Sequence, residues 1–260
     1  MNAMKSLIRK DIRGITANKQ LLIGMISVPI VLTVIIPSIF IIVLNFTPDF
    51  SDFDAMIRLL PVDVQPDNMK GAVISLLINN IMPVFFIIIP IMASSIMAAS
   101  SFVGEKEKRT LETLLYCPLS LKQIFRAKIL SSFIMSELVS FLSFIIMTLV
   151  TQIEIFITTG SLMLPNISWL IVLLLISPAM SLISITLIVR GSAKAQTMEE
   201  SQQLGALLVL PVIFLVAGQF VGIILINIWI LLGLGVFLAA IAWILINGSF
   251  KKISYESILR

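Results

Sequence analysis

The sequence predicts an all-α integral membrane protein with six transmembrane helices. Hydrophobic residues make up 58% of the 260 residues and charged residues only 12%, about half the ~25% that is usual in soluble proteins. The apolar residues lie in long continuous runs, which indicates helices, because a chain in lipid must satisfy its backbone hydrogen bonds internally. Basic residues gather beside alternate runs, which indicates a chain that crosses the membrane repeatedly.

The composition also excludes several classes of function. One cysteine and no histidine exclude a disulfide framework and every histidine-dependent catalytic or metal site. The G-x-x-x-x-G-K-[ST] pattern of a P-loop is absent from the sequence, so we expect no ATP binding by such a loop. We therefore predict that the chain is not an enzyme and holds no cofactor or metal. The net charge of +4 reflects membrane topology, and we expect no nucleic-acid partner.

Six apolar runs have the length needed to cross a bilayer. We expect the transmembrane helices at 21–44, 72–98, 129–151, 167–189, 204–225 and 228–246. The last two runs are separated by almost nothing polar, and Asn227 lies where the chain must turn. Five spans, or a re-entrant pair at this place, is the main alternative.

The distribution of Lys and Arg predicts the orientation of these helices. All but two of the 18 basic residues lie in the N-terminal segment, after the second and fourth runs, or at the C-terminus; the exceptions are Arg58 and Lys70. The segment 45–71, which contains both exceptions, is otherwise acidic. We therefore expect a domain at 21–250 with an outer loop at 45–71. Both termini, the loop 99–128 and the tail 251–260 are expected in the cytoplasm.

The N-terminal segment 1–20 has the pattern of an amphipathic helix on the inner leaflet. Met4, Leu7, Ile8, Ile12 and Ile15 recur at helical spacing, and basic residues occupy the rest of the helix circumference. The alternative is a flanking cluster of positive charges without a docked helix.

The loop 99–128 contains a pattern of its own. Leu111, Leu114 and Leu115 form a short apolar face, and Pro118 ends the helix that would carry it. Ser120 then begins a new helix, with Gln123 completing a capping box. Leucines exposed on a structured loop indicate a surface that a partner covers, although the loop could also pack as a hairpin on its own membrane domain.

This loop resembles that of the ABC-2 type transporter permeases. The resemblance rests on Gly104-Glu-Lys-Glu-Lys-Arg-Thr-Leu-Glu-Thr-Leu-Leu, on Pro118-Leu-Ser, and on Lys128 about eight residues later. Lys10-Asp11 near the N-terminus and Pro211 in the fifth run also fit the family. The opening Gly-Glu-Lys-Glu is most similar to the sodium-extrusion (Nat-type) branch and related peptide or drug exporters, whereas Arg109 replaces a glycine common in the family.

The resemblance implies the membrane subunit of an ATP-driven exporter in a prokaryotic cell membrane. A second permease copy or a paralogue would associate with it, and separate ABC ATPase subunits, which bind ATP and Mg, would dock beneath the pair. The leucines would occupy a groove on the ATPase while Glu105, Glu107 and Glu112 pair with its basic residues. The implied coupling residues are Gly104, Glu105, Glu107, Thr110, Leu111, Glu112, Leu114, Leu115, Pro118 and Ser120.

Polar residues within the spans are candidates for a translocation path, because ionisable groups in a bilayer are costly and often functional. Glu137 lies in the third run, beside a helical stripe made by Ser132, Ser136, Ser140 and Ser143. The candidates are Glu137, Ser136, Ser140, Asn79, Asn80 and Gln219. The same serines could instead form hydrogen bonds that hold the helices together.

Two other functions fit the same sequence. One is a secondary transporter or channel that uses an ion gradient, with Glu137 binding the proton or sodium ion. The other is a scaffold or immunity protein that transports nothing. Sodium, a peptide, an antibiotic and a lipid are all compatible with the sequence as cargo.

Overall fold

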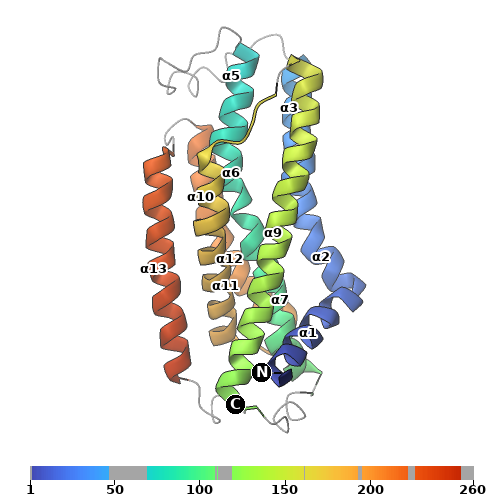
Figure 1. Cartoon of the computed structure of the whole chain (residues 1–260), viewed down its shortest axis with the longest axis vertical. Coiled ribbons are helices and arrows are strands. Elements are labelled where there is room, and N and C mark those ends of the chain that lie inside the picture. Colours follow the sequence, from blue (N-terminus) through green and yellow to red (C-terminus); the bar gives the residue numbers. More distant parts are fainter. Residues whose placement is uncertain are drawn as a thin grey trace.

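The computed structural model describes residues 2–46, 69–108, 110, 119–160, 162–192, 195–221 and 226–252. Every regular element in these ranges is helical, and together the helices form an elongated bundle (Figure 1). The chain begins with α1 (Asn2–Ala17). The helices of the bundle follow: α2 (Lys19–Ile30), η1 (Val31–Ile35), α3 (Ile36–Phe46), α5 (Met69–Leu76), η4 (Leu77–Ile81), α6 (Met82–Phe86), α7 (Ile88–Glu107), α9 (Leu121–Thr159), α10 (Ile167–Ile171), η5 (Val172–Ile176), α11 (Ser177–Gly191), α12 (Met198–Phe220) and α13 (Ile228–Lys252).

Six helical stretches in the described residues are long and apolar enough to cross a membrane, which confirms the predicted number. They are Lys19–Phe46, Gly71–Glu107, Leu121–Thr159, Ile167–Gly191, Met198–Phe220 and Ile228–Ser249. The fifth and sixth are separate helices. Asn227 caps the sixth, because its side chain accepts a hydrogen bond from the backbone N–H of Ile228 at 2.6 Å.

Three of these stretches contain a π-helical segment directly before a proline. The segments η1, η4 and η5 end one residue before Ile36-Pro37, Met82-Pro83 and Ser177-Pro178 respectively. A proline inside a helix lacks an N–H group, and its ring clashes with the carbonyl group four residues earlier. A widened π turn relieves that clash and leaves carbonyl groups free to bond elsewhere. The three prolines therefore account for the π turns in these helices.

The third span is much longer than the run 129–151 predicts. Helix α9 contains 39 residues, which at 1.5 Å per residue is roughly 58 Å, about twice the thickness of a bilayer core. It begins at Leu121, where Ser120 and Gln123 form the predicted capping box. Lys128, which the sequence places in the loop 99–128, therefore lies on this helix. Since α7 continues to Glu107, the connection between α7 and α9 is shortened to 108–120.

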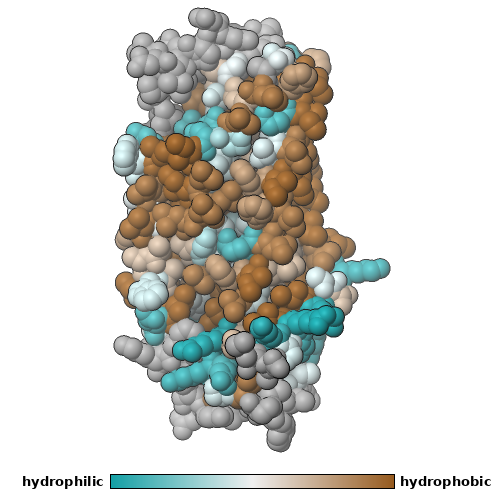
Figure 2. Space-filling model, in the orientation of Figure 1, coloured by the Kyte–Doolittle hydropathy of each residue, from teal (hydrophilic) through white to brown (hydrophobic). Residues whose placement is uncertain are grey.

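Helix α7 lies at the centre of the bundle, and α9, α11 and α12 all pack against it. Most of its side chains are buried, including Ile89, Ile91 and Met97. The outer helices expose apolar side chains such as Phe214 and Trp243, and Figure 2 shows one broad hydrophobic face. An apolar exterior around a packed centre is what a lipid-embedded bundle requires.

The N-terminal helix α1 docks against the bundle at the end that is lowest in Figure 1, called here the lower end. Leu7 of α1 packs with Ile124 and Ala127 of α9, and Ile15 joins the main core. Asn18 then ends this helix and caps α2, accepting hydrogen bonds from the backbone N–H groups of Gln20 and Leu21. The predicted amphipathic helix is present, and its apolar face contacts protein.

Candidate functional site

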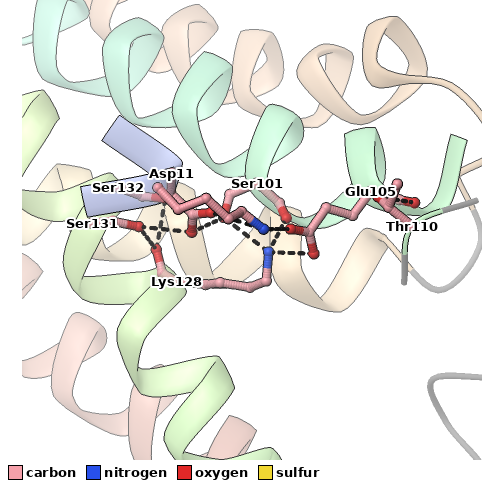
Figure 3. Close-up of polar contacts among 8 residues, drawn as sticks. Asp11, Ser101, Glu105, Thr110, Lys128, Ser131 and Ser132 are labelled. Atoms are coloured by element: carbon pink, nitrogen blue, oxygen red, sulfur yellow. Dashed lines mark hydrogen bonds and ion pairs between the residues drawn. The ribbon is translucent and has the colours of Figure 1, made fainter. Parts of the chain in front are cut away.

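A cluster of charged side chains, most of them buried, lies at the lower end, where α1, α7 and α9 meet (Figure 3). Lys10 and Asp11 come from α1, Glu105 from α7 and Lys128 from α9. We call these four residues the ion cluster. Glu105 lies two residues before the end of α7 and Lys128 lies two turns into α9, so the cluster joins the two helices that flank the connection 108–120.

Glu105 is the centre of the ion cluster. One carboxylate oxygen, Oε1, lies 2.5 Å from Lys10 Nζ, and the other, Oε2, lies 2.7 Å from Lys128 Nζ. The side chain of Lys128 is only 3% exposed and that of Glu105 is 11% exposed, whereas that of Lys10 is 56% exposed. A buried charge is tolerated only when it is paired and hydrogen-bonded. Two buried groups of opposite sign therefore hold α7 against α9.

Asp11 completes the cluster from α1. Its Oδ2 atom accepts hydrogen bonds from the hydroxyl groups of Ser101 at 3.0 Å and Ser131 at 3.3 Å. Lys128 donates to the backbone carbonyl of Ser101 and to its hydroxyl oxygen, the latter at 3.3 Å. Ser101 and Lys128 thus connect Asp11 to Glu105, and all three helices share one polar network.

Burial sets the protonation behaviour of Asp11. Desolvation is the largest effect and raises the pKa of this carboxyl above its ordinary value of 3.8. Lys128, the Ser101 hydrogen bond and Lys10 act in the opposite direction, whereas Glu105 adds to the increase. The aromatic ring of Phe102 also covers Lys128, with its centroid 5.4 Å from Nζ.

The residues that follow Glu105 attach the end of α7 to other parts of the lower end. The backbone N–H and hydroxyl of Thr110 both donate to the carbonyl oxygen of Glu105, at 2.9 and 3.2 Å. The carboxylate of Glu107 accepts a hydrogen bond from the N–H of Met198 at 3.2 Å, a favourable place for an anion because Met198 begins helix α12. A Cβ atom on Gly104 would lie 3.0 Å from Met198 Sδ, so the glycine allows close packing of α7 and α12.

The predicted coupling residues therefore divide into two groups. Gly104, Glu105, Glu107, Thr110 and Ser120 are described, and each makes its contacts within this chain. Within this chain, the carboxylate of Glu105 pairs with Lys10 and Lys128, and its pairing with basic residues of an ATPase stays a prediction. The others, Leu111, Glu112, Leu114, Leu115 and Pro118, lie outside the described residues.

The residues predicted for a translocation path form two separate groups. In the first, Glu137 accepts hydrogen bonds from Ser177 at 3.0 Å and Ser181 at 2.7 Å. The hydroxyl of Ser136 donates to the carbonyl of Pro90 at 3.0 Å and lies 3.0 Å from Ser181 Oγ. This group joins α9 to α7 and α11, and Glu137 remains partly exposed on the flank of the bundle.

The serine stripe beside Glu137 faces the interior of the bundle. Ser132, Ser136, Ser140 and Ser143 are all buried. Ser132 and Ser143 donate to carbonyl groups of α9 itself, four residues earlier in each case. Of these four serines, Ser136 is the one whose hydrogen bonds join α9 to other helices, through Pro90 and Ser181.

The second group lies around η4. Gln219 donates to the backbone carbonyl of Asn80 at 3.1 Å, and Asn79 accepts from the N–H of Asn166 at 3.0 Å. The indole N–H of Trp169 donates to the carbonyl of Ile78 at 3.1 Å. The π turn before Pro83 thus exposes carbonyl groups that α10 and α12 use, and the group supports helix packing.

Sequence reasoning missed the roles of Ser101, Ser131 and Ser177. Lys10-Asp11, Glu105 and Lys128 all appeared in the pattern that carried the family resemblance, yet nothing in their spacing showed that they meet. Their common feature was detectable: each is a charged residue within or near an apolar helix, where an unpaired charge is costly. This feature marks the residues as ones that need partners, but it does not show that they pair with one another.

Comparison with known protein families gives one assignment. The model of the ABC-2 type transporter family matches residues 2–230, a span that includes α1, the first five membrane-crossing stretches and the ion cluster. Comparisons with curated proteins and with solved structures gave no match. Since the family match covers most of the chain, this protein belongs to the ABC-2 type transporter family and is a multi-pass permease component of an ABC transporter.

Proposed function

We propose that this chain is the membrane subunit of an ATP-driven exporter and that it works with a separate ATPase. The lower end is then cytoplasmic, in agreement with the basic residues at the N-terminus and around the α7–α9 connection. ATP and Mg bind the partner, and a second permease copy or a paralogue completes the translocation unit in a prokaryotic cell membrane. The sodium, peptide or drug-exporting branch stays a prediction.

The observation that carries this proposal is the position of the ion cluster at the base of the connection 108–120. The connection begins at Lys108, three residues after Glu105, and ends at Ser120, eight residues before Lys128. A force applied to the connection therefore reaches an ion pair of 2.7 Å that joins the same two helices. Because both charges are buried, the pair resists separation and α7 and α9 move together.

In this proposal the roles of the connection are divided. Leu111, Leu114 and Leu115 supply the apolar contact with the ATPase, and Glu112 contributes to its orientation. Gly104, Glu105, Glu107, Thr110 and Ser120 act inside the permease, where they fix the two ends of the connection to α1, α9 and α12. This division assigns docking and transmission to different residues, so the two can be tested separately.

The proposed docking of the ATPase on the leucines is tested by co-purification of the permease with a co-expressed ATPase. Burial of one leucine contributes about 1.5–3 kcal/mol, so Leu114→Ala/Leu115→Ala should weaken the complex by at least roughly a hundredfold. The matched control is Leu162→Ala/Leu164→Ala, since both leucines are exposed in the loop before α10 at the upper end. Wild-type recovery of the ATPase with the Leu114/Leu115 variant would contradict the proposed docking surface.

A second part of the proposal concerns Glu137. It is partly exposed within a membrane-crossing helix. Placing a carboxylate there costs free energy, so its presence marks a candidate functional residue. We place it beside the cargo path, with Ser136 and Ser140 behind it and with Asn79, Asn80 and Gln219 shaping the upper end. Glu137→Gln should preserve assembly, because Gln can still accept from Ser177 and Ser181, but it should alter cargo-stimulated ATP hydrolysis. Unchanged stimulation across pH would exclude a role for its charge, including that of an ion ligand in a secondary transporter.

A further inference from the structure

The outward face of α1 carries a stripe of basic residues. Lys5, Arg9 and Arg13 are exposed and are spaced four residues apart. Four residues advance about 40° around an α-helix, so the three side chains share one stripe. Leu7 and Ile15 are buried on the opposite side, against the bundle. The docking of α1 therefore turns its basic residues outward.

The first turns of α9 extend this charge. Lys122 and Arg126 are exposed and are also four residues apart, while Ile124 and Ala127 of the same turns are buried against Leu7. Because α1 and α9 pack along this seam, both helices carry their cations on the outer side. We call Lys5, Arg9, Arg13 and Lys122 the cationic surface. In Figure 2, hydrophilic side chains form a band at the lower end, beneath the hydrophobic face.

Acidic residues on these two segments do not offset the charge. Asp11, the acidic residue of α1, is buried, and α9 has no acidic residue in its first turn. The exposed carboxylates described at the lower end are Glu107, Glu199 and Glu200, which lie at the end of α7 and the start of α12. Lys5, Arg9, Arg13 and Lys122 therefore have no acidic partner among the described residues and are available to an anionic ligand.

We propose that the cationic surface binds the headgroups of anionic phospholipids. Exposed apolar residues begin one turn after Arg126 on the same helix and continue at four-residue spacing, at Leu130, Ile134 and Leu138. A phospholipid can place its phosphate against the cationic surface and its acyl chains along the exposed apolar residues, so that one molecule contacts both. A soluble phosphate would use only the cations. Guanidinium groups suit the phosphate geometry, and each basic residue near an anionic bilayer strengthens the attraction.

Headgroup binding would also hold the ion cluster together. Asp11 lies on the protein-facing side of α1 and bonds to Ser101 of α7 and Ser131 of α9. Lipid held on the outer face of α1 therefore stabilises the docked helix that positions Asp11 and Lys10 beside Glu105. This inference concerns the permease alone and does not require the proposed ATPase coupling, so the two can fail separately.

The test uses the purified full chain in an uncharged detergent, titrated with dioleoylphosphatidylglycerol or dioleoylphosphatidylcholine while thermal unfolding is followed. The anionic lipid should raise the Tm and the zwitterionic lipid should not. Each basic residue near an anionic lipid surface increases the binding affinity roughly fivefold. Lys5→Gln/Arg9→Gln should therefore raise the half-saturating lipid concentration about 25-fold. The matched control Lys251→Gln/Lys252→Gln removes the same charge from the end of α13 and should titrate as the wild type. The charge-preserving Lys5→Arg/Arg9→Lys should do so too.

Three results would overturn the proposal. One is an equal rise in the Tm with the anionic and the zwitterionic lipid. Another is a half-saturating concentration of the anionic lipid for Lys5→Gln/Arg9→Gln that equals that of the wild type. The third is full stabilisation by inorganic phosphate alone, which would identify a site for a free anion. If the Gln variant does not fold, the wild type still decides, since raising NaCl from about 50 to about 500 mM screens exposed charges and must weaken binding of the anionic lipid. A salt-independent midpoint would contradict a headgroup site.

Discussion

Glu105 of α7 and Lys128 of α9 form a buried ion pair with 2.7 Å between the charged atoms. The pair closes the base of the connection that links the two helices. Lys10 shares the same carboxylate, and Asp11 reaches the pair through Ser101. The lower end of this permease is therefore held by charges rather than by apolar packing alone, and the following predictions test that arrangement.

Removal of Lys128 should destabilise the protein strongly. In Lys128→Met, Glu105 keeps only the half-exposed Lys10, and Asp11 loses its nearest buried countercharge. Breaking a buried pair costs about 3–5 kcal/mol, which thermal unfolding in detergent can measure. The double variant Lys128→Met/Glu105→Gln removes both charges and should recover part of the loss. A cost below ~0.5 kcal/mol for the single variant, typical of a surface change, would contradict the pairing.

Asp11 should give the stability a defined pH dependence. Burial raises its pKa in the folded state above 3.8, so the folded protein holds the proton more tightly than the unfolded chain. The stability from this group is complete below about pH 4 and is lost as the pH rises through the folded-state pKa.

The measurement compares wild type with Asp11→Asn, whose side chain stays neutral and can still accept from Ser101. The stability of the wild type relative to the variant should be greatest at low pH and should decline toward neutral pH. Thermal unfolding between about pH 4 and pH 8 would show this. A difference that is constant or grows with pH would mean that Asp11 is stabilised as a charged group.

Gly205 should be essential for the contact between α12 and α7. A Cβ atom at this position would lie 1.8 Å from Ser95 Oγ and 2.6 Å from Ser95 Cβ, so even alanine forces the helices apart. Gly205→Ala should cost about 1–3 kcal/mol, the range for overpacking. Gly233→Ala on α13 is the matched control, because nothing lies within 4 Å of a Cβ atom there. Equal unfolding temperatures for the two variants would refute this close approach.

The proposed orientation is tested by cysteine labelling. In a Cys117→Ser background, a cysteine at Ser51 should react with a membrane-impermeant maleimide on intact cells, whereas one at Lys252 should react only after permeabilisation. The basis is the concentration of Lys and Arg on one side of the predicted spans. The reverse labelling pattern would invert the topology and place the connection 108–120 outside the cell.

Sequence patterns predicted the fold class and the six spans because these depend on the lengths of apolar runs. They also predicted the capping box at Ser120 and the break at Asn227, since both are local. The apolar run starts at 129, whereas the helix that carries it starts at Leu121, directly after the predicted capping box. Lys122, Arg126 and Lys128 therefore lie on α9, and what the patterns did not show is that Lys128 is buried.

The ion cluster could not be predicted in the same way. Lys10 and Glu105 are 95 residues apart along the chain, and Asp11 is 90 and 120 residues from its hydrogen-bond donors Ser101 and Ser131. Such contacts depend on how α1 packs, and its amphipathic pattern is equally compatible with docking on lipid. Likewise, the pattern marked Glu137 as unusual but did not identify Ser177 and Ser181 as the donors on α11.

The central claim is that Glu105 transmits the action of the ATPase to the membrane helices. The most direct measurement is the amount of cargo moved per ATP hydrolysed by the complete complex in proteoliposomes, with Glu105→Gln compared with wild type and with Glu199→Gln, an exposed control on α12. We expect Glu105→Gln to bind its ATPase normally and to hydrolyse ATP, but to move at least roughly tenfold less cargo per ATP, the equivalent of about 1.4 kcal/mol of lost coupling. A ratio equal to that of the wild type would show that α7 and α9 need no ion pair to move together, and it would contradict the account.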